Sequence, residues 1–270
     1  MENLRYYSPV RFIYGSLVVL NSLLKTFRAK ISFPVDKKPF GQLDRDCFIE
    51  QSAMIDEQNE KNINTVTKAF LNVSNLKSVV NNAFVDWVSE SNTQYLMPDQ
   101  ETKKALVDIL NHSKFISQLN AHHGFEFYCK AAAIFRTQES ESKGTTSINF
   151  HRDGHPPFTY KLMVYLTNVA EKSGAFAFKP NSNAKIIIPR FGSYNYKRGF
   201  EAENYKKLSL YGDAGHTILF KNNALHAGGR TTEGERIVVT FLLHPRYLSS
   251  QDNSITAIDW TVGAKEYSLF

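Results

Sequence analysis

Two histidines and one aspartate stand where a metal ion could hold them together. His151 and Asp153 lie two positions apart at the end of the apolar segment INFH, and alternate residues of a strand face the same side. A third ligand is available in His226, which follows the apolar segment HTILFK and precedes a Gly-Gly pair. Two imidazoles and one carboxylate on one face are typical of non-haem Fe(II) sites, which leave coordination positions for a co-substrate and oxygen.

An arginine follows these ligands at the start of an apolar strand. Arg236 opens the segment RIVVTFLL, ten residues after His226. A cation at the start of such a strand is costly to bury unless it meets an anion, and a planar guanidinium suits a carboxylate. We therefore expect a dicarboxylate that chelates the iron at one end and contacts Arg236 at the other. 2-Oxoglutarate is such a molecule.

Three further residues could contribute to this site. Asn149 shares the face of His151 and could bind 2-oxoglutarate or a ligand imidazole, although an asparagine paired with the backbone explains it equally well. Arg230 competes with Arg236 for the co-substrate and ranks second, because it lies in a Gly-Thr loop. Lys161 opens the next strand, where it could bind an anionic group or sit at the rim of the site.

The same residues also have a reading without a metal. In that reading Asp153 caps the turn at Gly154 and His151 is a barrel histidine with its hydrogen bonds satisfied. Arg236 then pairs on the surface with Glu233 or Glu235. This alternative must explain three coincidences separately, so we favour the metal site.

The elements that position these residues change in character at Gly124. Before it, the spacing of Phe70, Val73, Leu76, Val80, Phe84 and Trp87 predicts a helix within residues 64–90. A second helix is predicted from Pro98 and Asp99 to Gly124. After Gly124, about eight short segments rich in β-branched and aromatic residues are separated by turn residues, which predicts strands. A polar, aromatic stretch at 190–208 is long for a turn and could be a loop over a site.

These elements predict a mainly β fold with a helical N-terminal part. The core would be a double-stranded β-helix, a cupin-like jelly roll, flanked by helices. We expect a mostly helical region over residues 1–123 that packs on the barrel, the barrel itself over 124–250, and a C-terminal tail over 251–270. Together these parts would form one catalytic domain.

The chain begins with a short apolar run, from Phe12 to Leu24, between basic residues. The run is too short to cross a bilayer, and no small-x-small cleavage site follows it. We expect either a helix that packs on the core or an amphipathic interfacial helix. The second would put residues 11–28 in peripheral contact with a membrane.

Composition narrows the partners and the compartment. The net charge of +6 is spread along the chain without a basic stripe, so nucleic acid is not an expected partner. This charge suits an anionic small molecule, lipid or glycan, although solvated surface lysines explain it as well. The two cysteines, Cys47 and Cys129, form no metal-type pair and fit a reducing, cytoplasmic compartment, with or without membrane contact. The oligomeric state is left open.

About half of the chain resembles the phytanoyl-CoA dioxygenase-like family of Fe(II)/2-oxoglutarate-dependent oxygenases. The matching stretches are FHRDG, YKLMVYLTNVAEKSGAFAFKPNSN, GDAGHTILFKNNALHAGG and ERIVVTFLLHP, within residues 148–245. The resemblance implies that His151, Asp153 and His226 bind iron and that Arg236 anchors 2-oxoglutarate. It also implies a double-stranded β-helix. The chain departs from the family at one turn, where PNSN replaces the family's Gly-Ser and His.

The function implied by the resemblance is that of a dioxygenase. It would use Fe(II), 2-oxoglutarate and O2 to hydroxylate an unactivated C–H bond of a small-molecule, lipid or glycan substrate, and would release succinate and CO2. Two other readings stay open on the same scaffold: a metal-binding jelly-roll module without turnover, and a cupin-type isomerase or metal hydrolase. Arg236 favours the first reading, because a closed structural metal site needs no buried co-substrate anchor.

Overall fold

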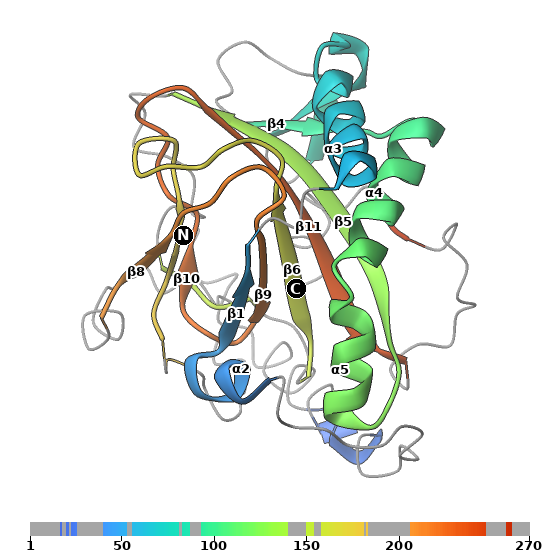
Figure 1. Cartoon of the computed structure of the whole chain (residues 1–270), viewed down its shortest axis with the longest axis vertical. Helices are drawn as coiled ribbons and strands as arrows, with labels where there is room; N and C mark the ends of the chain where they lie inside the picture. The colour runs from blue at the N-terminus through green and yellow to red at the C-terminus, as the bar shows by residue number, and fades with distance from the viewer. Residues whose placement is uncertain are drawn as a thin grey trace, which may run out of the picture.

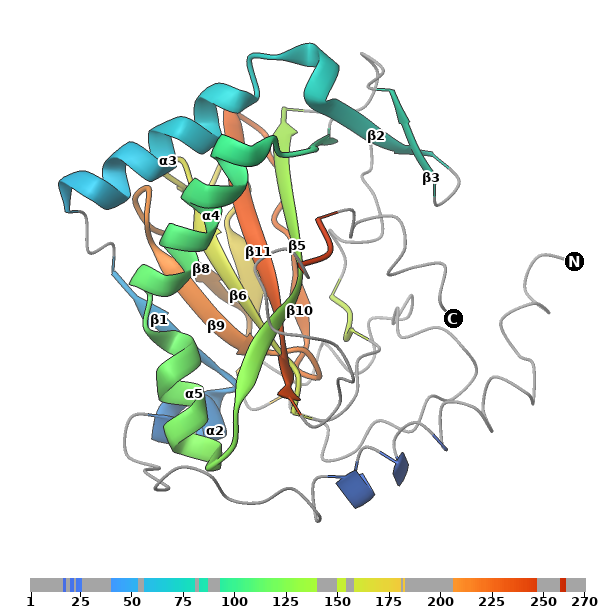
Figure 2. The same ribbon diagram turned by 90° about the vertical axis from the view of Figure 1, so that its right-hand side faces the viewer.

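Two antiparallel sheets face each other in the computed structural model of the chain, and helices cover the outer face of the larger sheet (Figures 1 and 2). The structure describes residues 17, 20, 21, 23–25, 40–52, 56–80, 83–86, 93–139, 150–153, 158–180, 182, 206–246 and 258–260. Within them, the expectation of a mainly β chain with flanking helices is confirmed.

The larger sheet has eight strands and the smaller has three. In spatial order the larger contains β1 (Phe48–Gln51), β9 (Thr217–Lys221), β6 (Tyr160–Tyr165), β11 (Glu235–Pro245), β5 (Phe127–Gln138), β4 (Thr93–Leu96), β2 (Leu76–Val80) and β3 (Ala83–Asp86). The smaller contains β10 (His226–Ala227), β7 (Phe176–Phe178) and β8 (Leu208–Leu210). Strand β11 lies between β5 and β6, so both of its edges are paired.

The described helices are α2 (Gly41–Asp46), α3 (Glu57–Ala69), α4 (Gln100–His112) and α5 (Phe115–His123), with a 3-10 turn at Val73–Asn75. Aspartates cap the two longest. The Asp56 side chain accepts a hydrogen bond from the Asn59 amide, and Asp99 accepts one from the Thr102 amide, each at 2.8 Å. Such caps satisfy amide groups that the first helical turn leaves without partners.

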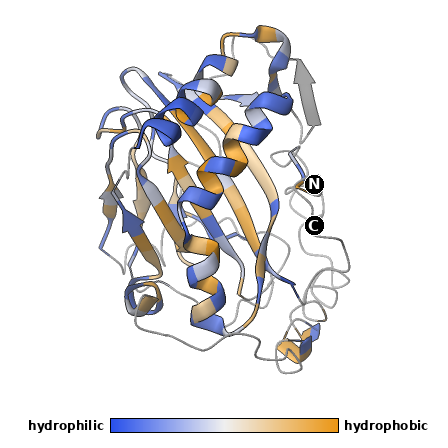
Figure 3. Cartoon of the chain, turned by 45° about the vertical axis from the view of Figure 1, so that its right-hand side comes forward, coloured by the Kyte–Doolittle hydropathy of each residue, from blue (hydrophilic) through white to orange (hydrophobic). Residues whose placement is uncertain are grey.

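Alternation along the strands separates two apolar clusters, one on each side of the larger sheet. An outer cluster joins the sheet to α3, α4 and α5 through residues such as Val66, Leu106, Leu119, Val239 and Phe241. An inner cluster lies between the sheets and includes Met163, Tyr165, Phe176, Phe178, Phe220 and Val238. The hydropathy colouring shows apolar strands behind helices with polar outer surfaces (Figure 3).

The helix predicted within residues 64–90 is wrong beyond Phe70. Helix α3 ends at Ala69, and the chain continues through the 3-10 turn into strands β2 and β3. The three-and-four spacing of apolar residues arose by chance across separate elements. Asn81 and Asn82 stand between two short β-forming runs and are a turn signal that the helical reading passed over. The region 1–123 therefore contributes strands β1 to β4 to the larger sheet.

The second predicted helix has the expected ends but is interrupted. Asp99 caps its start and Gly124, at φ 76°, ends it in the left-handed region, as expected. Between α4 and α5 the chain turns at Lys114, which adopts φ 57°. A lysine is an uncommon residue for this conformation, so the sequence carried no turn signal there.

Several expectations fall largely on residues outside the described part. These are the strands near 145–151 and 185–191, most of the loop at 190–208, and most of the apolar run in 11–28. In that run, the described Leu17, Leu20 and Leu24 are exposed. Among the described residues, no helix combines the length and apolarity needed to cross a membrane. The division at residues 123 and 250 stays a prediction.

Candidate metal centre

Backbone pairing brings the two predicted histidine ligands together. The His151 amide donates to the His226 carbonyl at 2.9 Å, and the His226 amide donates back to the His151 carbonyl at 3.0 Å. This isolated antiparallel bridge places the two imidazole rings 4.4 Å apart between centroids. Two segments separated by 75 positions in the sequence are thus joined at the residues that carry the imidazoles.

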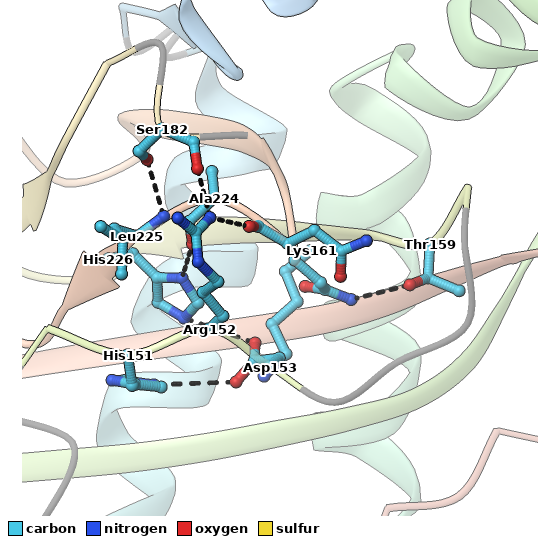
Figure 4. Close-up of polar contacts among 11 residues, drawn as sticks. His151, Arg152, Asp153, Thr159, Lys161, Ser182, Ala224, Leu225 and His226 are labelled. Atoms are coloured by element: carbon cyan, nitrogen blue, oxygen red, sulfur yellow. Dashed lines mark hydrogen bonds and ion pairs between the residues drawn. The ribbon is translucent and has the colours of Figure 1, made fainter. Parts of the chain in front are cut away.

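Asp153 completes the cluster. Its amide donates to the Asn222 carbonyl at 3.0 Å, which holds the segment after His151 beside the one before His226. The carboxylate oxygens lie 3.7 Å from His151 Nε2 and 3.4 Å from His226 Nε2 (Figure 4). One potential ligand atom from each residue lies within 4.8 Å of the others. These three atoms can contact one metal ion.

The hydrogen bonding of His226 prepares it to bind a metal through Nε2. Its Nδ1 atom lies 2.9 Å from the Ala224 carbonyl oxygen, which can only accept a hydrogen bond. We assign the proton to Nδ1 on this ground, and the neutral ring then keeps its lone pair on Nε2, the atom nearest Asp153. A backbone acceptor that orients a ligand imidazole in this way is typical of protein metal sites.

Three phenylalanines surround His226. The ring centroids of Phe220, Phe176 and Phe178 lie 5.0, 5.6 and 6.3 Å from that of the imidazole. Phe178 is also the cross-strand partner of His226. These rings exclude water from one side of the cluster and strengthen electrostatic interactions there.

Arg152 joins the segments that carry the ligands, a role that the sequence analysis missed. Its buried guanidinium donates to the carbonyls of Ser182 and Asn223. The Ser182 hydroxyl in turn accepts the Leu225 amide at 2.8 Å. Because Arg152 lies between two predicted ligands in sequence, its side chain fixes the segment of His151 against the segment of His226. No local pattern could have revealed these distant carbonyl partners.

Lys161 faces the cluster. Its Nζ atom lies 3.0 Å from Asp153 Oδ2 (Figure 4). Burial would raise the pKa of the Asp153 carboxyl, but the charge of Lys161 and interactions with His226 and His151 hold this pKa well below its usual range. Asp153 is therefore an anion, the form that binds a metal.

Arg236 is buried inside the barrel without an acidic partner among the described residues. One of its terminal nitrogens donates to the Gly174 carbonyl, and its Nε atom has no hydrogen-bond partner there. Burial lowers its pKa, which the nearby Tyr165 opposes in part, but a guanidinium stays charged in a protein. The surface pairing of the metal-free reading is wrong, because Glu233 pairs with Lys172 and Glu235 with Arg136.

Close backbone packing sets the position of the carbonyl that Arg236 contacts. A Cβ atom on Gly229 would lie 2.2 Å from the Ala175 carbonyl oxygen, and one on Gly174 would lie 2.7 Å from Thr231 Oγ1. Gly174 also adopts φ +85°. Both positions therefore require glycine. The loop after His226 thus packs directly on the residues that precede β7.

The remaining candidates are placed differently. Arg230 is exposed, in contrast to the buried Arg236, and so is poorly placed to contact the inner cluster. Asn149 lies outside the described residues. Within the described part of the chain, one group of three or more His, Cys, Asp or Glu side chains brings its potential ligand atoms together. This group is His151, Asp153 and His226.

The donor set suits a divalent metal. Two neutral imidazoles and one carboxylate match the ligands of non-haem iron and leave other positions for small ligands. Arg236, on the inner face, is a buried cation whose Nε lacks a partner in the described part, so an anionic ligand fits beside it. The residues present therefore fit a metal ion together with an anionic ligand.

No family model and no curated protein matches the sequence. Solved structures resemble the fold. The carbocyclase SnoK from nogalamycin biosynthesis, described as non-haem and α-ketoglutarate dependent, shares 10% identity at a TM-score of 0.57, over 77% of this chain and 84% of its own. EctD from S. alaskensis, with 2-oxoglutarate and 5-hydroxyectoine, shares 13% identity at a TM-score of 0.56, over 86% of this chain and 90% of its own. The epimerase SnoN, with Fe3+, α-ketoglutarate and nogalamycin RO, shares 13% identity at a TM-score of 0.55, over 75% of this chain and 80% of its own.

At these identities the similarity shows the fold. The chain has the jelly-roll architecture of these proteins, as the series of short strands after Gly124 predicted, with helices on the outer face of the larger sheet.

Proposed function

We propose that this chain is a non-haem Fe(II)- and 2-oxoglutarate-dependent oxygenase. The observation that carries the proposal is the pairing of two features within one barrel. One is the convergence of His151, Asp153 and His226, and the other is the buried Arg236 with no acidic partner in the described part. A structural metal site would explain the first feature and would leave the second as an uncompensated cost.

Each part of the proposed reaction has a place in the structure. His151, Asp153 and His226 would hold Fe(II), and Arg236 would bind the distal carboxylate of 2-oxoglutarate through its planar guanidinium. Phe176, Phe178 and Phe220 would keep water from the metal. The bound iron, with 2-oxoglutarate and O2, supplies oxidation of an unactivated C–H bond together with succinate and CO2.

The reaction that we propose for the substrate is hydroxylation. The structural neighbours support the coarser chemistry, since SnoK is described as α-ketoglutarate dependent and the SnoN and EctD structures contain α-ketoglutarate or 2-oxoglutarate. They also include an epimerase and a carbocyclase, so the fold alone does not select hydroxylation. Membership of the phytanoyl-CoA dioxygenase-like branch stays a prediction. The neighbours with bound ligands contain small molecules, which favours a small-molecule substrate over a polymer.

A direct test is the conversion of 2-oxoglutarate to succinate by the purified chain with Fe(II) and O2. The wild type should form succinate, and His226→Ala should reduce the rate at least 100-fold, because the metal loses an imidazole ligand. His244→Ala is a matched control, since His244 is a buried histidine beside Tyr128, outside the cluster. Equal succinate formation by the wild type and His226→Ala would contradict the proposal.

A metal-binding module without turnover is the alternative that this test addresses. Such a module would bind one metal ion per chain and would bind 2-oxoglutarate no more tightly than succinate or chloride. Calorimetric titration of the Ni(II)-loaded protein distinguishes the two functions, because Ni(II) occupies sites of this kind without supporting turnover.

A further inference from the structure

Lys161 carries a second cation to the same inner face as the metal cluster. It is the cross-strand partner of Phe220, whose ring lies 5.0 Å from that of His226. Met163 and Tyr165 follow it on the same face of β6, and both belong to the inner cluster. The side chain of Lys161 is 16% exposed, so its ammonium group is not sealed within the core.

Lys161 and Arg236 lie near opposite ends of this face. In the sheet, Lys161 pairs with Leu242, which is six residues beyond Arg236 on β11. Six residues of strand span about 20 Å. Even long side chains do not bring the two cations onto one carboxylate across that span. If Arg236 binds the distal end of 2-oxoglutarate, any anion that Lys161 binds near the metal in addition to Asp153 is therefore a different group.

Charge balance points to the same conclusion. The charges of the ferrous ion and the 2-oxoglutarate dianion cancel, and so do those of Asp153 and Lys161. Arg236 then leaves one positive charge within the barrel, and its Nε atom has no hydrogen-bond partner among the described residues. Uncompensated buried charge is unfavourable, so an anionic substrate is favoured over a neutral or cationic one.

We propose that Lys161 is a substrate-binding residue that holds an oxyanion, a carboxylate or a phosphate, beside the metal. The inference rests on the proposed function and assigns a substrate class to it. An ammonium has three donor hydrogens, so it can contact Asp153 Oδ2 and a substrate oxygen together. Contact with Asp153 fixes the distance between this anion and the reacting centre.

The test uses the full chain loaded with Ni(II) and 2-oxoglutarate, and calorimetry with four probes. Hexanoate and butyl phosphate carry the two oxyanions, and hexanamide and butanol are their neutral counterparts. At least one of the two oxyanion probes should bind more tightly than its neutral counterpart, and the tighter probe shows whether the site prefers a carboxylate or a phosphate. The Kd of that probe should rise at least tenfold in Lys161→Met, whereas Lys161→Arg should keep this Kd within threefold of the wild type.

Lys221→Met is the matched control. Lys221 has the same 16% side-chain exposure and lies 3.0 Å from Asp44, but this pair is at the other face of β9. This variant should leave all four Kd values within twofold of the wild type. If Lys161→Met does not fold, Lys161→Gln takes its place, and the melting temperature of each variant is recorded.

Two outcomes overturn the inference and leave the proposed function standing. In one, 2-oxoglutarate binds but neither oxyanion binds better than its neutral counterpart. In the other, Lys161→Met weakens binding of 2-oxoglutarate itself by tenfold or more, which would assign Lys161 to the co-substrate. Failure of the wild type to bind 2-oxoglutarate would overturn the proposed function and this inference with it.

Discussion

The two faces of strand β11 differ in what they contribute to the molecule. On the outer face, Ile237, Val239, Phe241 and Leu243 pack beneath the helices in an apolar cluster. On the inner face, Val238 adjoins the buried Arg236, and the inner cluster there includes Tyr165 and Phe176, whose ring centroid lies 5.6 Å from that of His226. Neighbouring residues of one strand thus have different roles, because successive side chains point to opposite faces of the sheet.

This difference shows where the fold gains stability and where it accepts a cost. Burial of large apolar side chains on the outer face is favourable, by about 1.5–3 kcal/mol for each. A buried guanidinium whose Nε atom has no hydrogen-bond partner among the described residues is unfavourable in the protein alone. We infer that the outer face stabilises the sheet on which the inner face can hold charged groups in place.

The largest expected effect is on the outer face. Phe241 is fully buried in the outer cluster, and Phe241→Ala should lower the free energy of unfolding by about 3–5 kcal/mol, through lost burial and the cavity left behind. Urea denaturation measures this change. The Kd of the folded fraction for 2-oxoglutarate should stay within twofold, and a large change in that Kd would break the division between the two faces.

Arg236→Met should produce the opposite pattern on the inner face. The Kd for 2-oxoglutarate should rise about 100-fold, or about 2.7 kcal/mol. The free energy of unfolding should be unchanged or higher, since an apolar residue of similar volume replaces a buried charge. Calorimetry and urea denaturation of the same preparation give both values. Strong destabilisation with unchanged 2-oxoglutarate binding would mean that Arg236 is structural.

Tyr165→Phe tests a residue of the inner face that joins the sheets. The Tyr165 hydroxyl donates to the Leu210 carbonyl at 2.8 Å and accepts the Phe176 amide at 3.1 Å. Loss of the hydroxyl leaves the Leu210 carbonyl and the Phe176 amide without this partner, and should lower the free energy of unfolding by about 2 kcal/mol. A result below about 0.5 kcal/mol in urea denaturation would show that water replaces the hydroxyl.

Tyr165→Phe also tests how the stability of the fold depends on pH. Burial raises the pKa of Tyr165 to about 12, against about 10 in an unfolded chain. The folded state therefore favours the neutral phenol, and this stabilisation is complete below about pH 10 and is lost as the pH rises through about 12. The difference between the wild type and Tyr165→Phe should shrink across that window. A constant difference would contradict the burial-driven shift.

The smallest effect belongs to a helix end far from the metal cluster. Asp99→Ala removes the cap that accepts the Thr102 amide and should cost about 1 kcal/mol without changing 2-oxoglutarate binding. The hydrogen bond from Thr102 lowers the pKa of Asp99. The contribution of the cap is thus present above the ordinary pKa and is lost as the pH falls below it. Thermal melts of the wild type and Asp99→Ala should therefore differ more at pH 7 than at pH 3.

The sequence sufficed for the strands and the converging residues where local chemistry was distinctive. Runs of β-branched and aromatic residues between turn residues located β5, β6, β9 and β11. The residue types and spacing of His151, Asp153 and His226 marked the cluster, and Arg236 was identified separately at the start of its strand. The resemblance to a known family pointed to the same four residues. Local reading failed where apolar spacing spanned separate elements, as at Leu76 in β2.

The partners of the ligands lay beyond local reading for a different reason. Arg152 contacts carbonyls at Ser182 and Asn223, and these contacts exist only once the sheets face each other. Lys161 was recognised as a candidate, but its contact with Asp153 depends on the register of β6 against β9. Register and long-range loop contacts are properties of the assembled fold rather than of any one segment.

The contact between Gly229 and the Ala175 carbonyl has a practical consequence for finding relatives. Any side chain at 229 would collide with that carbonyl, so proteins that share this backbone need glycine there even where overall identity is near 10%. Apolar strands tolerate many exchanges and discriminate poorly at such distances. A search pattern that requires glycine three positions after the histidine equivalent to His226 should therefore recover distant homologues with fewer false matches than a pattern built on hydrophobicity.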